Sequence, residues 1–361
     1  MAHKLTVCVL FGGQSSEHEV SRVSAASVIK NLNKDKYDIV TIGITKKGEW
    51  LLYQGPIDRI QTGEWEKGYV CKAIIAPDAS VNGIIKFGES EAANAKIDVV
   101  FPVLHGLYGE DGTIQGLLEL AGIPYVGAGV LASSVGMDKI YTKIIFKNAG
   151  IPQADWEVVF KEELDNMDMV IERLEKKFTY PCFVKPSNAG SSVGITKAHN
   201  RAELIDGLKL AAVHDRKILV EEFINGREVE CAVLGNYCDA EASILGEIIP
   251  SKEFYDYDAK YNDSNSELII PARLPEETTE QIRKYAIEAF KKLDGTGLSR
   301  VDFFVHKETG KIYINEINTM PGFTNISMYP KLWEASGLSY SQLLDRLIQL
   351  ALEKSGGKKR I

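Results

Sequence analysis

The chain has 361 residues, of which 45% are hydrophobic, 25% charged and 9% aromatic. This length supports two or three domains with their own cores and excludes a disulfide-stapled miniprotein, and the ordinary composition excludes a chain dominated by disorder or fibrous repeats. The 42 basic and 50 acidic residues give a formal net charge of −8, so nucleic acids and anionic membrane surfaces are not expected as partners, because both are themselves negatively charged.

The first third of the chain alternates short apolar runs with helical periodicity. Leu5–Phe11 is almost continuously apolar and ends in two glycines, after which apolar and small residues recur at helical spacing over Val20–Leu32. Further buried strands are predicted at Tyr37–Ile44 and Ile97–Leu104. This pattern predicts an α/β domain with a doubly wound parallel sheet over residues 1–128.

A small α+β domain is expected over residues 129–218. Its helices are predicted at Ala132–Ala149 and Lys161–Lys177, and its strands at Trp156–Phe160 and Pro181–Lys185. The last of these strands leads into a polar stretch of small residues, which is typical of a loop.

Residues 219–361 are expected to form a third domain, also α+β. A strand at Lys217–Phe223 opens it, and antiparallel-looking strands and a helix that begins near Pro275 follow. Residues 250–267 are polar and aromatic without core periodicity, and a loop of this length is usually functional or disordered.

Cysteine usage and the N-terminal residues indicate the compartment. The five cysteines form no CxxC pair and no zinc-ligand spacing, and most lie in apolar stretches, which is typical of reduced core residues. No run of about 18 uncharged apolar residues occurs, and the first residues lack the features of a signal peptide. We therefore expect a cytoplasmic protein with no membrane partner.

Acidic residues lie on two predicted strands near the C-terminal end. Asp302 is on the first, and Glu316 and Asn318 are two apart on the second, so that strand alternation points the latter two the same way. Two carboxylates and an amide oxygen suit Mg²⁺, which bridges protein carboxylates to substrate phosphates. A solvated acidic edge is the alternative, but such residues are depleted in strands and here have apolar neighbours, which favours a metal site.

The segment FVKPSNAGSSVG, residues 183–194, carries the residue types of a phosphate site. Lys185 ends a predicted strand and is followed by a loop with Ser191 and Ser192, where hydroxyls and exposed backbone N–H groups can bind an anion. The sequence is not a Walker A motif, and an ordinary hairpin turn is the alternative. Lys139, at a predicted helix start, is a weaker candidate of the same type.

Two glycine-rich turns follow strands of the first domain. GGQSSEHEV, residues 12–20, lacks the third glycine of a dinucleotide fingerprint, which disfavours NAD, and Glu17 there could simply stabilise a helix dipole. HGLYGEDG, residues 105–112, is placed where an α/β sheet presents substrate loops, although a lone histidine such as His105 is more often structural.

Eight segments together resemble one family. GGQSSEHEVS, HGLYGEDG, MDK, FVKPSNAGSSVG, VEEFINGREVE, YDYDAKY, RVDFF and NEINTMPGFT occur in the order found in the D-alanine–D-alanine ligases of the ATP-grasp superfamily. The resemblance spans nearly the whole chain. It implies a three-domain ATP-grasp architecture, with ATP held between the second and third domains, and a homodimer.

The implied reaction condenses two D-alanine molecules to D-alanyl-D-alanine for peptidoglycan precursors. Transfer of the ATP γ-phosphoryl group to a carboxylate gives an acyl phosphate, and attack by an amine then releases the dipeptide, ADP and phosphate. Phosphoryl transfer depends on positioning and charge neutralisation, which agrees with an acidic cluster facing lysines. By matching positions, the resemblance implies two Mg²⁺ ions, for which Mn²⁺ can substitute, on Asp302, Glu316 and Asn318.

The resemblance also implies a set of ATP-binding residues: Lys139, Lys185, Ser191, Ser192, Glu221, Glu222, Glu228 and Lys260. Within this set Glu228 is expected on the ribose. Some relatives have a glutamate at the position of Ala189 and a lysine at that of Glu222, so the contacts of the phosphate loop and of the adenine are left open.

The implied catalytic residues are Glu17, His105, Ser191, Tyr261, Arg300 and Gly322. Arg300 and the backbone N–H of Gly322 are expected to stabilise the oxyanion of the tetrahedral intermediate. Glu17 is expected to accept the ammonium of the first D-alanine. A hydrogen-bonded link through Ser191 and Tyr261 would then close the long polar loop over the site.

The implied substrate-binding residues are Glu17, His105, Ser327 and Met328. Ser327 is expected near the carboxylate of the second D-alanine, and Met328 as an apolar wall that favours a methyl group. Hydrophobic pockets reject an added hydroxyl only about 100-fold, so a D-alanine–D-serine ligase is an alternative. Another ATP-grasp carboxylate–amine ligase and a non-catalytic nucleotide-binding module are further alternatives.

Overall fold

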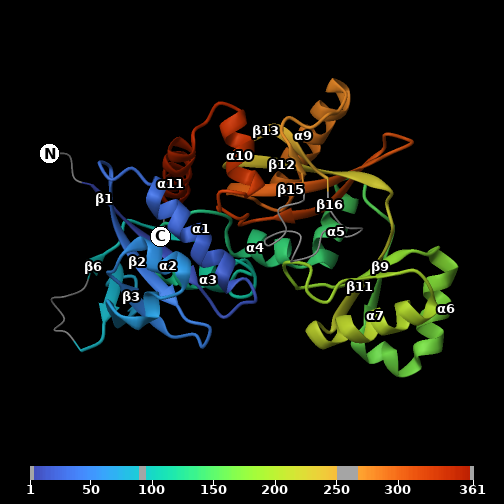
Figure 1. Cartoon of the computed structure of the whole chain (residues 1–361), viewed down its shortest axis with the longest axis horizontal. Helices are drawn as coiled ribbons and strands as arrows, with labels where there is room; N and C mark the ends of the chain where they lie inside the picture. Colours follow the sequence, from blue (N-terminus) through green and yellow to red (C-terminus); the bar gives the residue numbers. More distant parts are fainter. Residues whose placement is uncertain (1–3, 89–94, 250–266, 358–361) are drawn as a thin grey trace.

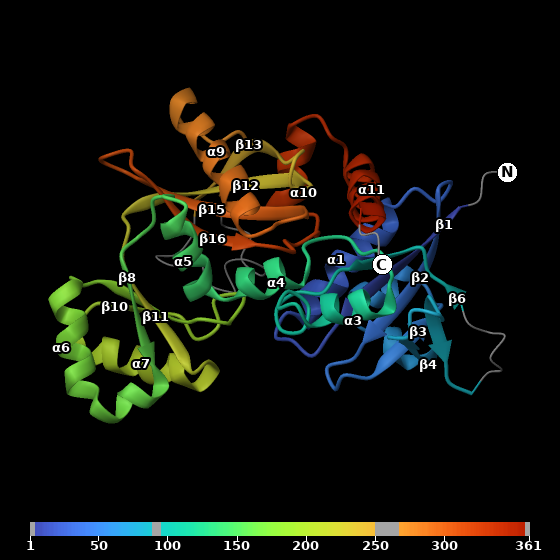
Figure 2. The ribbon, with the colours of Figure 1, turned by 180° about the vertical axis from the view of Figure 1, so that it is seen from behind.

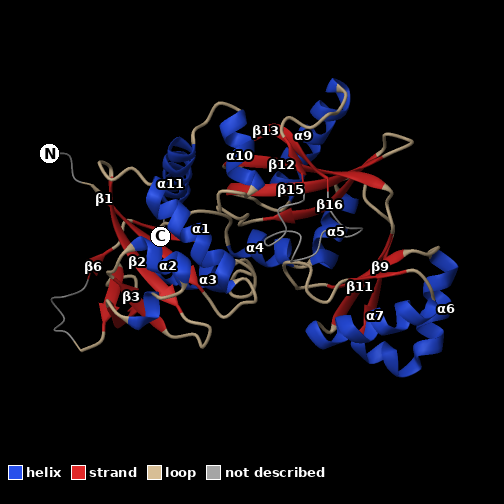
Figure 3. Cartoon of the chain, viewed as in Figure 1, coloured by secondary structure: helices blue, strands red, loops and turns tan. Residues whose placement is uncertain are grey.

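The computed structural model describes residues 4–88, 95–249 and 267–357. Its strands form sheets of seven, four and five strands, and each sheet is the centre of one lobe (Figure 1). The N-terminal lobe is blue in that view, the central lobe green and yellow, and the C-terminal lobe yellow to red. Helices pack on the faces of the sheets (Figure 3). The expected three-part α/β architecture is therefore confirmed.

The N-terminal lobe has the strand order β6-β5-β4-β3-β2-β1-β7. Its strands are β1 Leu5–Gly12, β2 Tyr37–Ile44, β3 Trp50–Tyr53, β4 Val70–Ile75, β5 Gly83–Lys86, β6 Ala95–Lys96 and β7 Val99–Pro102. Its helices are α1 His18–Asn31, α2 Ile57–Thr62 and α3 Thr113–Ala121, with a short 3₁₀ helix at Trp65–Lys67.

Only part of this sheet is parallel. β1 pairs in parallel with β2 and β7, as expected, whereas β3 to β6 extend the sheet in antiparallel fashion. The turn between β2 and β3 is too short for a helical crossover, so β3 returns as a hairpin partner. The parallel half brings the loops that follow β1 and β7 to one edge of the lobe.

The central lobe has the strand order β10-β9-β11-β8, and all of its pairs are antiparallel. Its elements are β8 Trp156–Phe160, a 3₁₀ helix at Lys161–Asn166, α6 Met167–Lys177, β9 Cys182–Pro186, β10 Thr196–Ala198, α7 Arg201–His214 and β11 Lys217–Glu222. α6 and α7 pack side by side on one face of the sheet (Figure 2). The expected domain division after residue 218 falls within β11, and this strand belongs to the central sheet because it pairs there along both edges.

Two helices join the first two lobes where the sequence predicts one. α4 covers Val130–Met137 and α5 covers Lys139–Asn148, and they are separated by Asp138, whose backbone is extended with φ −87° and ψ 101°. The Asp138 side chain accepts hydrogen bonds from the N–H groups of Ile140 and Tyr141, so it caps α5 and starts a new helix.

The C-terminal lobe has an antiparallel sheet of order β14-β13-β12-β15-β16. Its elements are β12 Gly226–Gly235, β13 Glu241–Ile249, β14 Glu267–Ile269, α9 Glu276–Lys292, β15 Gly297–His306, β16 Ile312–Asn318, α10 Met328–Ala335 and α11 Tyr340–Gly357. α9 begins directly after Pro275, as predicted, and no helix in the described ranges is long and apolar enough to span a membrane.

The two faces of this sheet have different coverings, and the difference creates the site. α9 covers one face with a core that includes Val229, Val301 and Phe303. On the other face, α10 packs over Ala232 and Leu298, in a core that also joins α11 to the N-terminal lobe. α10 covers only part of this face. Where it does not reach, every second side chain of β12, β15 and β16 faces a cavity.

Candidate active site

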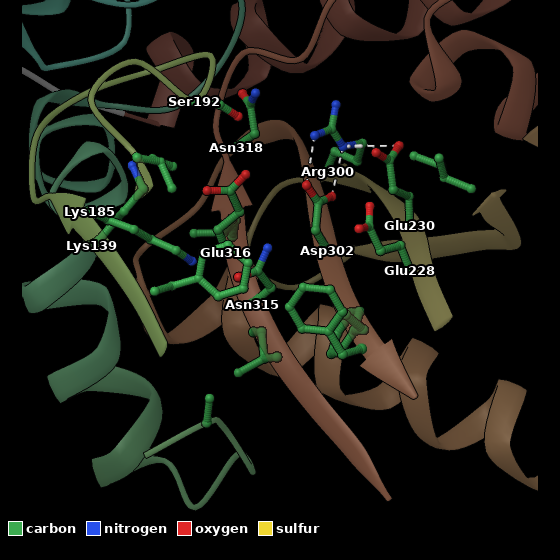
Figure 4. Close-up of a pocket in the computed structure, with 18 of the residues that line it drawn as sticks. Lys139, Lys185, Ser192, Glu228, Glu230, Arg300, Asp302, Asn315, Glu316 and Asn318 are labelled. Carbon is green, nitrogen blue, oxygen red and sulfur yellow. Dashed lines mark hydrogen bonds and ion pairs between the residues drawn. The ribbon is translucent and has the colours of Figure 1, made fainter. Parts of the chain in front are cut away.

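A cavity of about 860 Å³ lies where the three lobes meet. The N-terminal lobe contributes Glu17 and His105 to its walls, the junction of α4 and α5 and the central lobe contribute Lys139, Lys185 and Ser191, and the C-terminal lobe contributes a row of acidic residues with one arginine. Figure 4 shows Lys139 and Lys185 on one side of this space and the acidic strands on the other.

The predicted metal ligands lie on facing positions of two neighbouring strands. Asp302 of β15 is directly opposite Glu316 of β16, and Asn318 is opposite Arg300. Glu316 and Asn318 line the cavity with Asp302, as strand alternation predicts (Figure 4). A bulge between β15 and β16 adds a further polar side chain, because Asn315 is the extra residue and also lines the cavity. The sequence pattern contains no signal for this bulge.

These donors fit Mg²⁺ in their chemistry. In the described part of the chain no group of three or more His, Cys, Asp or Glu side chains is arranged to hold a metal ion. The proposed ligands here are two carboxylates and one amide oxygen. In Mg²⁺ sites with so few protein ligands, water and substrate phosphate complete the coordination of the ion. The Asn318 Oδ1 atom also accepts the backbone N–H of Met320 at 2.9 Å, which fixes the orientation of its amide.

Arg300 lies between carboxylates at the centre of the acidic row. Its Nε and Nη2 atoms donate to the two oxygens of Asp302, each at 2.7 Å, and Nε is 3.1 Å from Oε2 of Glu230. Burial disfavours the charged guanidinium, but Asp302 and Glu230 more than offset this, and the pKa of Arg300 is raised. Glu230 is a site residue that the sequence does not single out.

Lys185 is held by a buried carboxylate. The two oxygens of Glu221 contact Lys185, at 2.6 Å, and Lys143 of α5, so that one acidic side chain lies between two lysines. The resemblance assigns Glu221 to ATP, whereas here its oxygens hold these lysines. Lys143 has no signal in the sequence, because a lysine in a helix is usually solvated.

The pH dependence of stability should report this cluster. Burial disfavours the Glu221 carboxylate, but Lys143 and Lys185 more than offset this and lower its pKa to about 2. Because the pKa of Glu221 is lower in the folded than in the unfolded chain, its ionised carboxylate stabilises the fold at pH values above the ordinary carboxyl range. This stabilisation is lost as the pH falls through about 2. We expect Glu221→Gln to lower the melting temperature at pH 7, and the difference from the wild type to shrink between about pH 4.5 and pH 2.

Thermal unfolding at several pH values measures this difference. Glu157→Gln is a control, because Glu157 pairs with Lys177 on the surface and such pairs contribute little. A Glu221→Gln difference that stays constant down to pH 2 would contradict the predicted ionisation.

Asp138 joins α5 to the loop that follows β9. It accepts the Ser187 hydroxyl at 2.6 Å and contacts the buried ammonium of Lys217 on β11. The next residue, Lys139, donates to the carbonyl oxygen of Ala189 at 2.7 Å. Asp138, which caps α5 and splits the predicted helix, therefore also places Lys139 on the loop of residues 187–195, called here the glycine-serine loop.

The glycine-serine loop has an uncommon backbone conformation. Ser191 and Ser192 have φ values of 48° and 60°, which non-glycine residues rarely adopt and which cluster at ligand-binding loops. Both serines line the cavity. The structure thus brings Ser191, Ser192, Lys139 and Lys185 to the wall of one cavity.

Glu17 lies at the start of α1, against the same loop. The Ser191 hydroxyl donates to Glu17 Oε1, across the boundary between the central and N-terminal lobes. A Cβ atom on Gly106 or on Gly190 would lie 2.5 Å from Glu17 Oε2, so a side chain at either position would displace this carboxylate. Glu17 is 6% exposed and lines the cavity.

His105 is fixed on both sides of its ring. Nδ1 lies 3.0 Å from the carbonyl oxygen of Met320, to which it can only donate, and Nε2 lies 3.1 Å from the Ser24 hydroxyl. Burial disfavours the imidazolium, but Glu110 at 3.4 Å more than offsets this and raises the pKa of His105. His105 therefore joins two lobes as well as lining the cavity.

The remaining expected residues are placed differently. Ser327 and Met328 are not among the described residues that line the cavity. Met328 is 5% exposed and packs in the core, where a Cβ atom on Gly246 would lie 2.7 Å from its sulfur, so the structure does not place it as a wall of a substrate pocket. Ser327 bonds to Thr324 and lies beside Gly322, which does line the cavity.

The other expected nucleotide contacts come from β11 and β12. Glu222 and Glu228 both line the cavity, and one oxygen of Glu222 accepts the backbone N–H of Asp155 at 2.8 Å. Lys260 and Tyr261 lie outside the described residues.

Comparisons with known proteins give one consistent result. Two family models match, "D-ala D-ala ligase N-terminus" over residues 6–128 and "D-ala D-ala ligase C-terminus" over residues 145–349. A D-alanine–D-alanine ligase of Acetivibrio thermocellus is 62% identical, covering 98% of this chain and 97% of its own, and one of Thermoanaerobacter sp. strain X514 is 58% identical, covering 99% of each.

Solved structures agree with these matches. The VanG D-Ala:D-Ser ligase of Enterococcus faecalis superposes with a TM-score of 0.87 at 41% identity, covering 97% of this chain and all of its own. The D-alanine–D-alanine ligase of Coxiella burnetii also gives a TM-score of 0.87, at 39% identity, covering 99% of this chain and 97% of its own.

Proposed function

The chain belongs to the D-alanine–D-alanine ligase family, and from this premise we propose that the cavity between the three lobes is its active site. The enzyme is an ADP-forming ligase that uses ATP to condense two D-alanine molecules to D-alanyl-D-alanine. The roles of individual residues below belong to the proposal.

ATP is proposed to bind between the central and C-terminal lobes. Lys139, Lys185 and the glycine-serine loop would contact its phosphates, and Glu228 its ribose. The positions of both lysines are supported by their fixed partners, the Ala189 carbonyl and Glu221. Lys260 and Tyr261, which lie outside the described residues, are proposed to complete this site.

Asp302, Glu316 and Asn318 are proposed to hold two Mg²⁺ ions with the phosphates. When bound, these ions neutralise the charge of the transferring phosphoryl group. The donor chemistry of the three side chains supports this assignment, because all three are hard oxygen ligands on one strip of the cavity wall.

Glu17 is proposed to bind the ammonium of the first D-alanine. The carboxylate of that substrate would then receive the γ-phosphoryl group beside Ser191. Arg300 and the Gly322 N–H would stabilise the oxyanion when the amine of the second D-alanine attacks, with Ser327 near its carboxylate. His105 would fix the floor of the first subsite through its contacts to Ser24 and Met320.

The hydrogen bond from Ser191 to Glu17 is the observation that carries this arrangement. It joins the loop expected on the phosphates to the carboxylate expected on the amino acid. A phosphoryl donor and an acceptor carboxylate would therefore meet at this contact, which is the geometry that phosphoryl transfer requires.

Release of ADP and phosphate by purified protein tests the function. ATP, Mg²⁺ and single amino acids are supplied in turn, and the product is identified by mass spectrometry. D-alanine is expected to stimulate ADP release and to yield the dipeptide. Equal stimulation by L-alanine, or by no amino acid, would contradict the function. A mixture of D-alanine and D-serine measures the second subsite directly, where predominance of D-alanyl-D-serine would favour the alternative ligase.

We expect Ser191→Ala to raise the KM for the first D-alanine by about tenfold, the usual effect of losing one hydrogen bond to a charged group. The Glu17 carboxylate would lose the donor that orients it toward the ammonium. Initial rates at varied D-alanine measure this change. Ser192→Ala is the matched comparison, because it is expected to change the KM for ATP instead, and equal effects of both variants on D-alanine would contradict the assignment.

The enzyme is further proposed to be a cytoplasmic homodimer. Leu120 of α3 is 67% exposed and Leu131 of α4 is 63% exposed, and because the two helices contact each other, this face is the proposed dimer surface. Sedimentation velocity distinguishes a 40.0 kDa monomer from a dimer.

A further inference from the structure

Three carboxylates form a row across the sheet of the C-terminal lobe. Glu230 of β12 is in register with Asp302 of β15, and Asp302 is in register with Glu316 of β16. Directly opposed residues of antiparallel strands share a face, so all three side chains face the cavity. Arg300, two residues before Asp302, lies on the same face and reaches back over the row (Figure 4).

Arg300 is bound by two members of this row. Asp302 accepts both its Nε and its Nη2 hydrogens, and Glu230 lies 3.1 Å from Nε. The three side chains are largely buried, with exposures of 16% for Arg300, 14% for Asp302 and 8% for Glu230. A guanidinium this buried needs carboxylate partners, because an unpaired charge there is strongly destabilising.

Asp302 thus has two uses that compete. The proposed function requires its oxygens on a metal ion, whereas here both oxygens accept hydrogens from Arg300. A carboxylate that moves to a divalent cation weakens its bidentate pair with a guanidinium. Arg300 must nevertheless keep its place beside the reacting carbonyl, so it needs a partner that the metal does not take.

We propose that Glu230 is a positioning residue that holds Arg300 in the cavity when a metal ion binds Asp302. Glu230 is suited to this because it contacts Nε from the strand on the far side of Asp302 from Glu316, away from the other proposed metal ligands. The proposal rests on the proposed function, since it takes Asp302 as a metal ligand and Arg300 as the residue that stabilises the oxyanion.

Binding of Mn²⁺ in the presence of the β,γ-imido analogue of ATP tests the proposal without turnover, with electron paramagnetic resonance as the readout. In Glu230→Gln, Arg300 depends more on Asp302 and competes harder with the metal, so Mn²⁺ affinity should fall by roughly tenfold. In Arg300→Met the competitor is gone, and affinity should rise. The double variant should match Arg300→Met alone, because Glu230 acts through Arg300.

Each outcome has a definite meaning. Unchanged Mn²⁺ affinity in Glu230→Gln overturns the proposal. The proposal is also overturned if Glu230→Gln lowers Mn²⁺ affinity as much in the Arg300→Met variant as in the wild type, because Glu230 would then attract the metal directly. If the wild type binds no Mn²⁺, both the metal site and the role of Glu230 are overturned. If the wild type binds Mn²⁺ and Glu230→Gln binds it equally well, only the role of Glu230 is overturned. If Glu230→Gln does not fold, Glu230→Asp, which draws the carboxylate back by one methylene group, should show the same fall.

Glu247→Gln is the matched control. Glu247 also lines the cavity and accepts both Nε and Nη2 of Arg227, but its register partner is Val229, so it does not belong to the row of Glu230, Asp302 and Glu316. This variant should lose thermal stability and keep its Mn²⁺ affinity. Turnover gives a second readout, because Glu230→Gln should lower kcat at saturating Mn²⁺ and leave the KM for ATP unchanged.

Discussion

Replacement of Glu316 by glutamine is expected to abolish measurable turnover and to leave the fold intact. Glu316 lies opposite Asp302 and lines the cavity, where it is proposed to hold a metal ion against the ATP phosphates. An amide keeps the shape of the side chain but loses the charge that binds the metal. Because metal charge contributes several kcal/mol to phosphoryl transfer, we expect kcat to fall by at least about a thousandfold.

Initial rates of ADP release, with thermal unfolding in parallel, measure this effect. Glu308→Gln is a suitable control, because Glu308 is an exposed residue in the turn between the same two strands. A Glu316→Gln enzyme with a rate within tenfold of the wild type would remove Glu316 from the metal site. Loss of both rate and folded structure would instead show that Glu316 supports the sheet.

Replacement of Arg300 by methionine is expected to give the second large effect, a fall in kcat of about a hundredfold to a thousandfold. Arg300 is aimed into the cavity by Asp302 and Glu230, so its charge is oriented before the reaction begins. A preorganised cation of this kind acts on the negative charge that develops when the amine attacks. The KM for ATP is expected to change much less than kcat.

Arg227→Met is the matched control for this variant. Arg227 also lines the cavity and has a bidentate carboxylate partner, Glu247, but it is not proposed to stabilise the oxyanion. If both variants lower kcat equally, the effect belongs to the loss of an ion pair in the sheet. If Arg300→Met raises the KM for ATP without lowering kcat, Arg300 acts in nucleotide binding instead.

The candidate site was predictable where it depends on local spacing. Glu316 and Asn318 face the same cavity because strand side chains alternate, and this holds whatever the partners of the strand are. The loop with Ser191 and Ser192 was predictable from its composition. The contact between Ser191 and Glu17 joins residues 174 positions apart, and only the resemblance to a known family implied it.

Other features had no signal in the sequence. Glu230 belongs to the site because β12 pairs with β15 in one particular register, and a shift by one residue would turn it to the α9 side. Asp138 interrupts a helical pattern because its side chain caps a new helix and binds Ser187 and Lys217 at the same time. Met328 was expected in the pocket and lies in the core, because α10 packs its first turn on the sheet.

By itself, the sequence determined the class of the segments with clear periodicity and the family of the enzyme, because periodicity, turn residues and ordered motifs are properties of neighbours along the chain. Only the tertiary structure decided which side chains meet. The pairing of Arg300 with Asp302 and Glu230, the two lysines on Glu221 and the end of the central sheet at β11 all depend on strand register and lobe packing. Those are set by contacts between distant residues, whose combined burial, rather than local preference, selects one arrangement.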